Sequence, residues 1–216
     1  MLRTVSTVLT VLTVLTDPTV TLAQQPKPAK PKVPAIPLAV AGLAGQGVAV
    51  LPLTMVVGAP GVPGTSGPKA RAALILWADS LLADILVERA PEVTWVLPPA
   101  LRNTARRAAG MLPSPDQMGQ SVMRSPGLKD LPDPMRNYVR QLLALSGGAR
   151  YALIPASLYL SPAGGDSLTV QLSAVLADGR LGRVVWRTVA VGQGETADAA
   201  YRAALATMFP PDPTAP

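Results

Sequence analysis

The 216-residue sequence contains no cysteine and no histidine. The first absence excludes disulfide bridges, thiolate nucleophiles, thiolate–zinc sites and lipid attachment through cysteine. The second excludes histidine metal ligands and the Ser-His-Asp and Cys-His catalytic arrangements. Any catalysis would have to use carboxylates, lysine, tyrosine or a Ser–Lys pair. We therefore expect a non-enzymatic protein without metal or cofactor, while the lack of cysteine alone leaves the redox compartment open.

Aromatic residues are also scarce, at 4% of the sequence, whereas apolar residues make up 49% and charged residues 15%. This composition predicts a folded domain with a core mainly of leucine, valine and alanine. The formal net charge is +6. A basic balance favours anionic partners, although a charge spread over a chain of this length mainly confers solubility.

The N-terminal residues have the layout of a cleavable signal peptide. Arg3 provides the positive start, an uncharged stretch of valine, leucine and threonine follows, and Thr-Leu-Ala ends at Ala23. The apolar stretch is too short to span a bilayer ~30 Å thick. We predict a signal peptide over residues 1–23 and export to the periplasm or the exterior, with membrane contact only transiently through this leader.

Proline and lysine dominate the next stretch, "QQPKPAKPKVPAIP". Proline at every second or third position forbids helix and favours extended geometry. We predict a linker over residues 24–45, an α/β domain over residues 46–210 and a disordered tail over residues 211–216.

Hydrophobic periodicity within the domain predicts an α+β fold with a single mixed sheet of about five strands and helices packed on it. The order is β-α-β-α-α-β-β-β-α. Strand patterns occur at residues 45–58, 92–98, 149–160, 167–177 and 182–192, and helical patterns at 70–89, 99–109, 133–146 and 196–209. Residues 111–131 are predicted to be irregular, with one helical turn near 116–123.

Side-chain spacing assigns a buried face to three of these helices. The expected buried residues of the first helix are Leu74, Trp77, Leu81 and Ile85, broadened by Leu76, Leu82 and Leu86. Those of the third are Met135, Tyr138, Leu142 and Leu145, with Asp133 as the N-cap and Pro134 as the first helical residue. Those of the last helix, capped by Thr196, are Tyr201, Leu205, Met208 and Phe209.

The loop over residues 58–69 has glycine at every third position and lies between a strand and a helix, where a phosphate-binding loop would lie. It does not match G-x-x-x-x-G-K-[ST], and its prolines lack the N–H groups that cradle phosphate. A nucleotide site is therefore disfavoured, and a loop without bound ligand is the simpler interpretation.

Three arginines, Arg102, Arg106 and Arg107, form the densest basic patch of the sequence. The absence of interleaved aromatic residues argues against nucleic acid. A solvated helix face is the default interpretation, and a surface for an anionic partner is the alternative.

Carboxylates on the first helix, Asp79, Asp84 and Glu88, raise the possibility of a hydrolase. The last two are one helical turn apart, and such a pair is more often a solvated helix edge. No other motif in the sequence supports acid–base catalysis.

The stretch "AVLADGRLGRVVWRTVAV" combines two alternating strands with a turn that contains Asp178, Gly179 and Gly182. Together with "VAVLPL" near the start of the domain and "GARYALIPASLYL" in its middle, it resembles a group of bacterial envelope domains. The group includes the amino-terminal domain of TolB, CsgG and LpoB. The resemblance covers residues 47–209 and implies a structural turn, with Trp186 packed on the core. We transfer no functional residue from it, because the chain lacks the lipid-bearing cysteine of several relatives.

We therefore expect an exported, non-enzymatic accessory domain of the cell envelope that binds another protein through a sheet edge or a loop surface. The alternative is a binding module for a small molecule or an anionic envelope polymer, which would use the loop over residues 58–69 and the arginines Arg102, Arg106 and Arg107.

Overall fold

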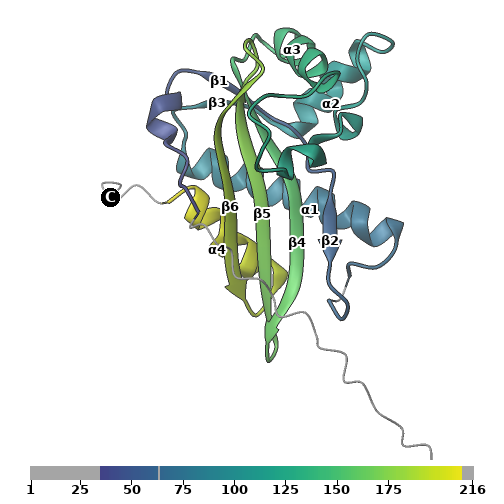
Figure 1. Cartoon of the computed structure of the whole chain (residues 1–216), viewed down its shortest axis with the longest axis vertical. Coiled ribbons are helices and arrows are strands. Elements are labelled where there is room, and N and C mark those ends of the chain that lie inside the picture. Colours follow the sequence, from purple (N-terminus) through teal and green to yellow (C-terminus); the bar gives the residue numbers. More distant parts are fainter. Residues whose placement is uncertain (1–34, 63, 211–216) are drawn as a thin grey trace, which may run out of the picture. The chain divides into compact units, whose positions relative to one another are not determined.

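The computed structural model describes residues 35–62 and 64–210, all within the second of the chain's two units. These residues form one mixed sheet of six strands with four α-helices packed on it (Figure 1), which confirms the predicted α+β class. The strands are β1 (Gly47–Val50), β2 (Val56–Gly58), β3 (Thr94–Val96), β4 (Tyr151–Gly164), β5 (Ser167–Asp178) and β6 (Arg183–Gly194). The α-helices are α1 (Pro68–Arg89), α2 (Pro98–Arg107), α3 (Met135–Leu145) and α4 (Ala197–Met208). Short 3-10 helices are η1 (Val40–Leu43), η2 (Pro115–Gln117) and η3 (Gln120–Arg124).

The sheet has the strand order β3-β1-β4-β5-β6, with β2 also paired to β4. The pairs of β1 with β3, β1 with β4 and β2 with β4 are parallel, whereas β4, β5 and β6 form an antiparallel meander. The long strand β4 therefore joins both halves of the sheet. It pairs with β5 along its whole length and with β1 and then β2 along its other edge.

The predicted strand over residues 45–58 is two strands in the structure, which raises the strand count above the expected five. The ladder with β4 holds from Leu51 N–H to the Leu153 carbonyl (2.9 Å) and resumes where Leu158 N–H donates to the Met55 carbonyl (2.9 Å). Between these bonds lie Pro52 and Pro155, neither of which has an N–H group to donate. The two prolines explain why the ladder breaks here.

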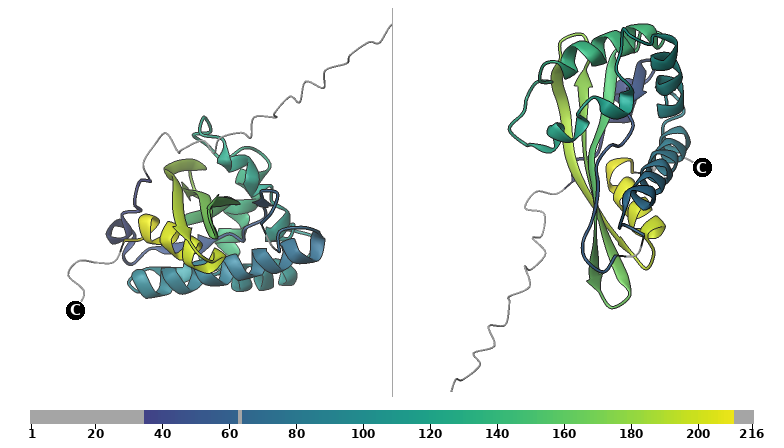
Figure 2. Two further views of the ribbon diagram at one scale, coloured as in Figure 1. Left: turned by 90° about the horizontal axis from the view of Figure 1, so that it is seen from below. Right: turned by 90° about the vertical axis from the view of Figure 1, so that its right-hand side faces the viewer.

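Helices α1 and α4 cover one face of the sheet (Figure 2). Alternation along residues 167–177 predicts that Leu168, Val170, Leu172, Ala174 and Leu176 share one face. The structure confirms this, since the last four are buried in the first core and Leu168 packs against it. All four residues expected to be buried on α4 are buried, and Thr196 caps the helix by accepting the N–H of Ala199 (3.1 Å).

One residue expected in the core of α1, Leu76, is 60% exposed, so that prediction is wrong. Residues two positions apart in an α-helix, such as Leu76 and Ala78, are separated by about 200° of rotation. Leu76 therefore points away from the sheet-facing side, which contains Ala78, Leu82 and Leu86.

Helices α2 and α3, with η3, cover only one end of the second face, where they build a second core with Ile154 and Val175. The predicted N-cap of α3 is wrong, since the helix begins at Met135 and has no side-chain cap. Leu145, which was expected to be buried, is 49% exposed, and Val139 and Leu143 are buried instead. Leu143 packs against the β5–β6 turn at Gly179.

The segment before β1 packs on the domain from Ile36 onward, although it falls within the predicted linker. Ile36 N–H donates to Thr188 Oγ1 (2.8 Å), and Trp186 Nε1 donates to the Ile36 carbonyl (3.1 Å). Leu38 and Leu43 are buried in the first core, against which Trp186 also packs. The predicted leader, most of the predicted linker and the predicted tail lie outside the described residues.

Replacing Gly192 by alanine should destabilise the fold, because α4 packs directly on this position of β6. A Cβ there would lie 2.2 Å from the Ala200 carbonyl oxygen and 2.2 Å from the Ala204 nitrogen. We expect a loss of about 1–3 kcal/mol in the free energy of unfolding, measured by urea denaturation. Gly127→Ala is the matched control, since no atom lies within 4 Å of its added Cβ. Equal stability of the two variants would contradict the packing of α4 described here.

Candidate functional site

The β5–β6 turn, residues 178–182, is built around the carboxylate of Asp178. Its Oδ1 accepts the backbone N–H groups of Arg180 (2.9 Å) and Leu181 (3.0 Å), and its Oδ2 accepts Nε of Arg150 (3.2 Å). Such bonds from an aspartate to the N–H groups that follow it are a common way of fixing a turn. The geometry agrees with the structural role implied by the resemblance.

The pKa of Asp178 lies below its ordinary value. Burial alone would raise it, but the N–H of Leu181, the guanidinium of Arg150 and the N–H of Arg180 together outweigh burial. The side chain is only 3% exposed. Asp178 therefore acts as an ionised structural anchor rather than a proton donor.

Helix α3 lies against this turn. Gly182 has a φ of 72°, and a Cβ there would lie 2.6 Å from Nε of Arg136. A Cβ on Gly179 would similarly lie 2.0 Å from Cδ1 of Leu143. A larger residue at either position would displace these α3 side chains, and the positive φ of Gly182 favours glycine independently of the space.

A second polar cluster lies at the break between β1 and β2. Asp79 Oδ1 on α1 accepts the N–H of Leu53 (2.8 Å), and its Oδ2 accepts Nη2 of Arg102 on α2 (2.8 Å). Arg102 also holds Asp116 on η2 through Nη2 (2.8 Å) and Nε (3.1 Å), and Ser114 donates to Asp116 (3.1 Å). The cluster thus connects the broken strand with two helices and the irregular segment.

The two carboxylates in this cluster are shifted in opposite directions. Burial raises the pKa of Asp79, although the N–H of Leu53 and Arg102 partly compensate. Burial would also raise the pKa of Asp116, but hydrogen bonds and charge from Arg102 outweigh it and lower the pKa. The charge of Arg102 is therefore paired with these two carboxylates.

Asp79, predicted from the sequence only as a candidate hydrolase carboxylate, has a structural role that the sequence did not reveal. It is 5% exposed, and both of its oxygens are bonded to protein groups. One signal was available, since Asp79 lies on the apolar side of α1 beside Ala78 and Leu82. An acidic residue in such a position needs a buried partner.

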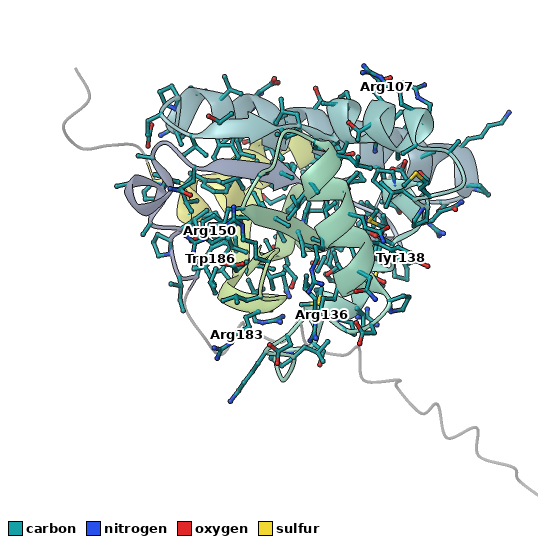
Figure 3. The ribbon with its side chains drawn as sticks, turned by 90° about the horizontal axis from the view of Figure 1, so that it is seen from above. Arg107, Arg136, Tyr138, Arg150, Arg183 and Trp186 are labelled. Atoms are coloured by element: carbon teal, nitrogen blue, oxygen red, sulfur yellow. The ribbon has the colours of Figure 1, made fainter. Side chains whose placement is uncertain are left out.

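The predicted basic patch on α2 is divided by the structure. Arg102 is occupied by two carboxylates, whereas Arg106 and Arg107 are exposed, and Figure 3 shows Arg107 pointing away from the fold. An open depression of about 340 Å³ is lined by Pro99, Arg102, Arg106, Ser114 and Asp116. An anionic partner on α2 stays a prediction, and it now depends on Arg106 and Arg107.

The glycine-rich loop between β2 and α1 is folded back on itself. Thr65 donates to the Val62 carbonyl (2.9 Å), and Val62 is buried in the first core. A Cβ on Gly58 would lie 2.2 Å from the side chain of Thr65. These contacts account for Gly58 without a ligand, and ligand binding by the loop stays a prediction.

The remaining candidate carboxylates, Asp84 and Glu88, are exposed on α1, as expected for a solvated helix edge. Among residues 35–62 and 64–210, no group of three or more acidic side chains is placed to hold a metal ion. Within the same ranges, no helix combines the length and the apolar character needed to cross a membrane.

The sheet also carries a row of side chains over which no helix of the described residues packs; we call it the uncovered row. Strand register aligns Val57 with Tyr159, Tyr159 with Gln171, and Gln171 with Val191 across four strands. The neighbouring residues Leu158 and Leu172 face the first core, so this row lies on the opposite face. Val57 and Tyr159 are 38% and 41% exposed. In the right-hand view of Figure 2, the helices on this side of the sheet gather at the other end.

The sequence matches no known protein family and no curated protein sequence. Among solved structures, the LpoB C-terminal domain from Salmonella enterica is 16% identical with a TM-score of 0.35, covering 71% of this chain and 84% of that chain. Lipoprotein GNA1162 from Neisseria meningitidis is 18% identical with a TM-score of 0.36, covering 70% and 82%. The PelC dodecamer from Paraburkholderia phytofirmans is 15% identical with a TM-score of 0.37, covering 81% and 90%.

LpoB is among the proteins that the sequence resembles, whereas TolB and CsgG gain no support from these structures.

Replacing Arg102 by glutamine should destabilise the protein, because it leaves the buried carboxylate of Asp79 without its cation. We expect a loss of about 2–4 kcal/mol in the free energy of unfolding by urea denaturation. The double variant Asp79→Asn/Arg102→Gln should recover part of that loss, since the unpaired charge is gone. Arg106→Gln, on the exposed side of α2, should stay within about 0.5 kcal/mol of the parent. A similar small effect for Arg102→Gln would contradict the cluster.

Replacing Asp178 by asparagine should cost about 1–2 kcal/mol at neutral pH, because the ionised carboxylate holds the turn. A carboxyl with a lowered folded pKa stabilises the protein above its unfolded pKa of ~3.9 and loses that effect as pH falls through the folded pKa. The stability difference between parent and variant should therefore shrink below about pH 4. Unfolding curves across this pH range, with Asp166→Asn in the exposed β4–β5 turn as the control, test this. A difference that stays constant with pH would show that the charge is not involved.

Proposed function

We propose that this protein is an exported, non-enzymatic accessory domain of the bacterial cell envelope that binds another protein through the uncovered part of its sheet. The observation that carries the proposal is the row formed by Val57, Tyr159, Gln171 and Val191. The signal-peptide layout and the resemblance to envelope domains support the location.

The face is better suited to a partner than the β6 edge of the sheet. Along its first half, β6 is already paired: Val184 N–H donates to the Lys129 carbonyl (2.8 Å), and the Gly182 carbonyl accepts the N–H of Leu131 (2.7 Å). Further along β6, the side chain of Thr188 accepts the N–H of Ile36 in the segment that precedes β1. Strand addition needs free backbone groups, so these contacts oppose it over this part of the edge.

The chemistry of the row defines the partner. It contains two valines, a tyrosine and a glutamine, and no charged side chain. Tyrosine with flanking aliphatic groups is typical of the central part of protein interfaces, where charge is depleted. We therefore propose a partner protein with a matching uncharged, aliphatic contact surface.

Photocrosslinking in cells tests the proposal. A photoreactive amino acid replaces Gln171 in the full chain, and irradiation should give discrete adducts with one partner. Adding Tyr159→Glu should reduce these adducts at least ~10-fold. A charge at the centre of an apolar contact weakens the binding free energy by about 2 kcal/mol or more. Leu76→Glu, at a more exposed apolar position on α1, is the control and should leave the adducts unchanged.

Unchanged thermal unfolding of Tyr159→Glu would show that lost adducts reflect binding rather than folding, since the side chain is partly exposed. Adducts that resist Tyr159→Glu, or that respond equally to Leu76→Glu, would exclude this face as the binding surface.

A further inference from the structure

The end of the sheet that contains the β5–β6 turn combines an exposed leucine with exposed arginines. Leu181, at the tip of the turn, is 64% exposed and lies between Arg180 and Arg183, which are both exposed. On α3, Leu145 is 49% exposed and Arg140 is also exposed. Exposed leucine is common, but a leucine bracketed by cations on a fixed turn has the composition of a membrane-surface contact.

The tip is held in place by bonds within the fold. Asp178 accepts the N–H of Leu181 at 3.0 Å, and Gly182 N–H donates to the Asp178 carbonyl at 2.8 Å. The Gly182 carbonyl in turn accepts the N–H of Leu131. The backbone on both sides of Leu181 is thus occupied, while its side chain is left in solvent. Because the backbone of the turn is already fixed, binding of this side chain to a surface would cost little conformational entropy.

Positive charge surrounds the tip. Arg150 is fixed by Asp178 and by the ring of Tyr151, 4.9 Å from its guanidinium carbon, and Arg136 lies over Gly182. Viewed from this end, Figure 3 shows Arg136, Arg150 and Arg183 in the same region. Near the turn and α3 the cations are Lys129, Arg136, Arg140, Arg150, Arg180 and Arg183, and the acidic residues are Asp130, Asp133 and the buried Asp178.

The opposite end of the same strands is acidic. Asp166 lies in the β4–β5 turn and Glu195 follows β6, and both are exposed. A strand of this length separates the two ends by about 35–40 Å. The charge is therefore distributed along the strands so that a negative surface would attract one end and repel the other.

We propose that this basic end, centred on Leu181, docks on an anionic lipid surface. The leucine enters the boundary between headgroups and acyl chains, and the arginines around it contact the lipid phosphates. A bilayer needs no complementary cavity. The depression beside α2 and a second one between α1 and α4, lined by residues such as Ile85 and Arg202, lie elsewhere. The proposal is independent of the partner-binding face, and it adds a membrane contact to the transient one expected of the leader.

The experiment uses the absence of cysteine from the sequence. Leu181→Cys in the full chain is labelled with the fluorophore NBD, whose emission rises and shifts to the blue on entering lipid. Vesicles of phosphatidylethanolamine with phosphatidylglycerol should produce this change, and vesicles of phosphatidylcholine should not. Leu76→Cys on α1, with a similar exposure of 60%, is the matched control and should show no change. Because the probe reports position 181 itself, binding through the predicted leader would not imitate the result.

Arg180→Gln/Arg183→Gln in the labelled chain should weaken the response about 30-fold in vesicle concentration, at roughly fivefold for each arginine. Arg106→Gln/Arg107→Gln removes the same charge elsewhere and should have little effect. Raising the salt concentration should weaken the response further.

Three results would overturn the proposal: no change at position 181, an equal change with neutral vesicles, or an equal change at position 76. A response to polyglutamate but not to anionic vesicles would also overturn it, and would assign this end to an acidic protein instead.

Discussion

The fold depends on how one interruption in the sheet is satisfied. Pro52 and Pro155 lie where the pairing of β4 changes from β1 to β2, and neither has an N–H to donate. Buried backbone groups at the break must therefore find other partners. The N–H of Leu53 finds the carboxylate of Asp79, which is a charge inside an apolar layer and needs a cation in turn. Arg102 supplies it and extends to Asp116. The partners that satisfy the break thus connect α1, α2 and η2.

This arrangement leaves the sheet unevenly covered. Helices α1 and α4 span one face. Helices α2 and α3, with η3, pack on the other face only at the end of the sheet that contains β1, against residues such as Ile154 and Val175. The row from Val57 to Val191 lies outside that second core. An antiparallel sheet tolerates one solvated face when its outward side chains are mixed in polarity, as they are here. The uncovered face is therefore compatible with a stable monomer and is also available for a partner.

Local patterns predicted the parts of the fold that depend on neighbours in sequence. Alternation along β5 gave the correct buried face, and the hydroxyl of Thr196 gave the start of α4. The failures involve distant partners. Asp79 bonds to Leu53 and Arg102, 26 and 23 residues away, and no local signal connects them. Helix α3 turns Leu143 inward because Gly179, far along the chain, leaves room for it. The basic patch on α2 was recognised by spacing alone, which could not show that Arg102 already had two anionic partners.

The relation between the basic end and the uncovered face is set by a bulge in β6. Ala177 pairs with Val184, but Leu176 pairs with Trp186, so Val185 is an additional residue in β6. Without it, every following residue of β6 would move to the other face. Val191 would then point at α4 and Gly192 would point away, although only a glycine fits beneath Ala200 and Ala204. The packing of α4 therefore requires the bulge. The same bulge lets the β5–β6 turn keep Leu181 and its arginines at the end of the strands while Val191 stays in the uncovered row.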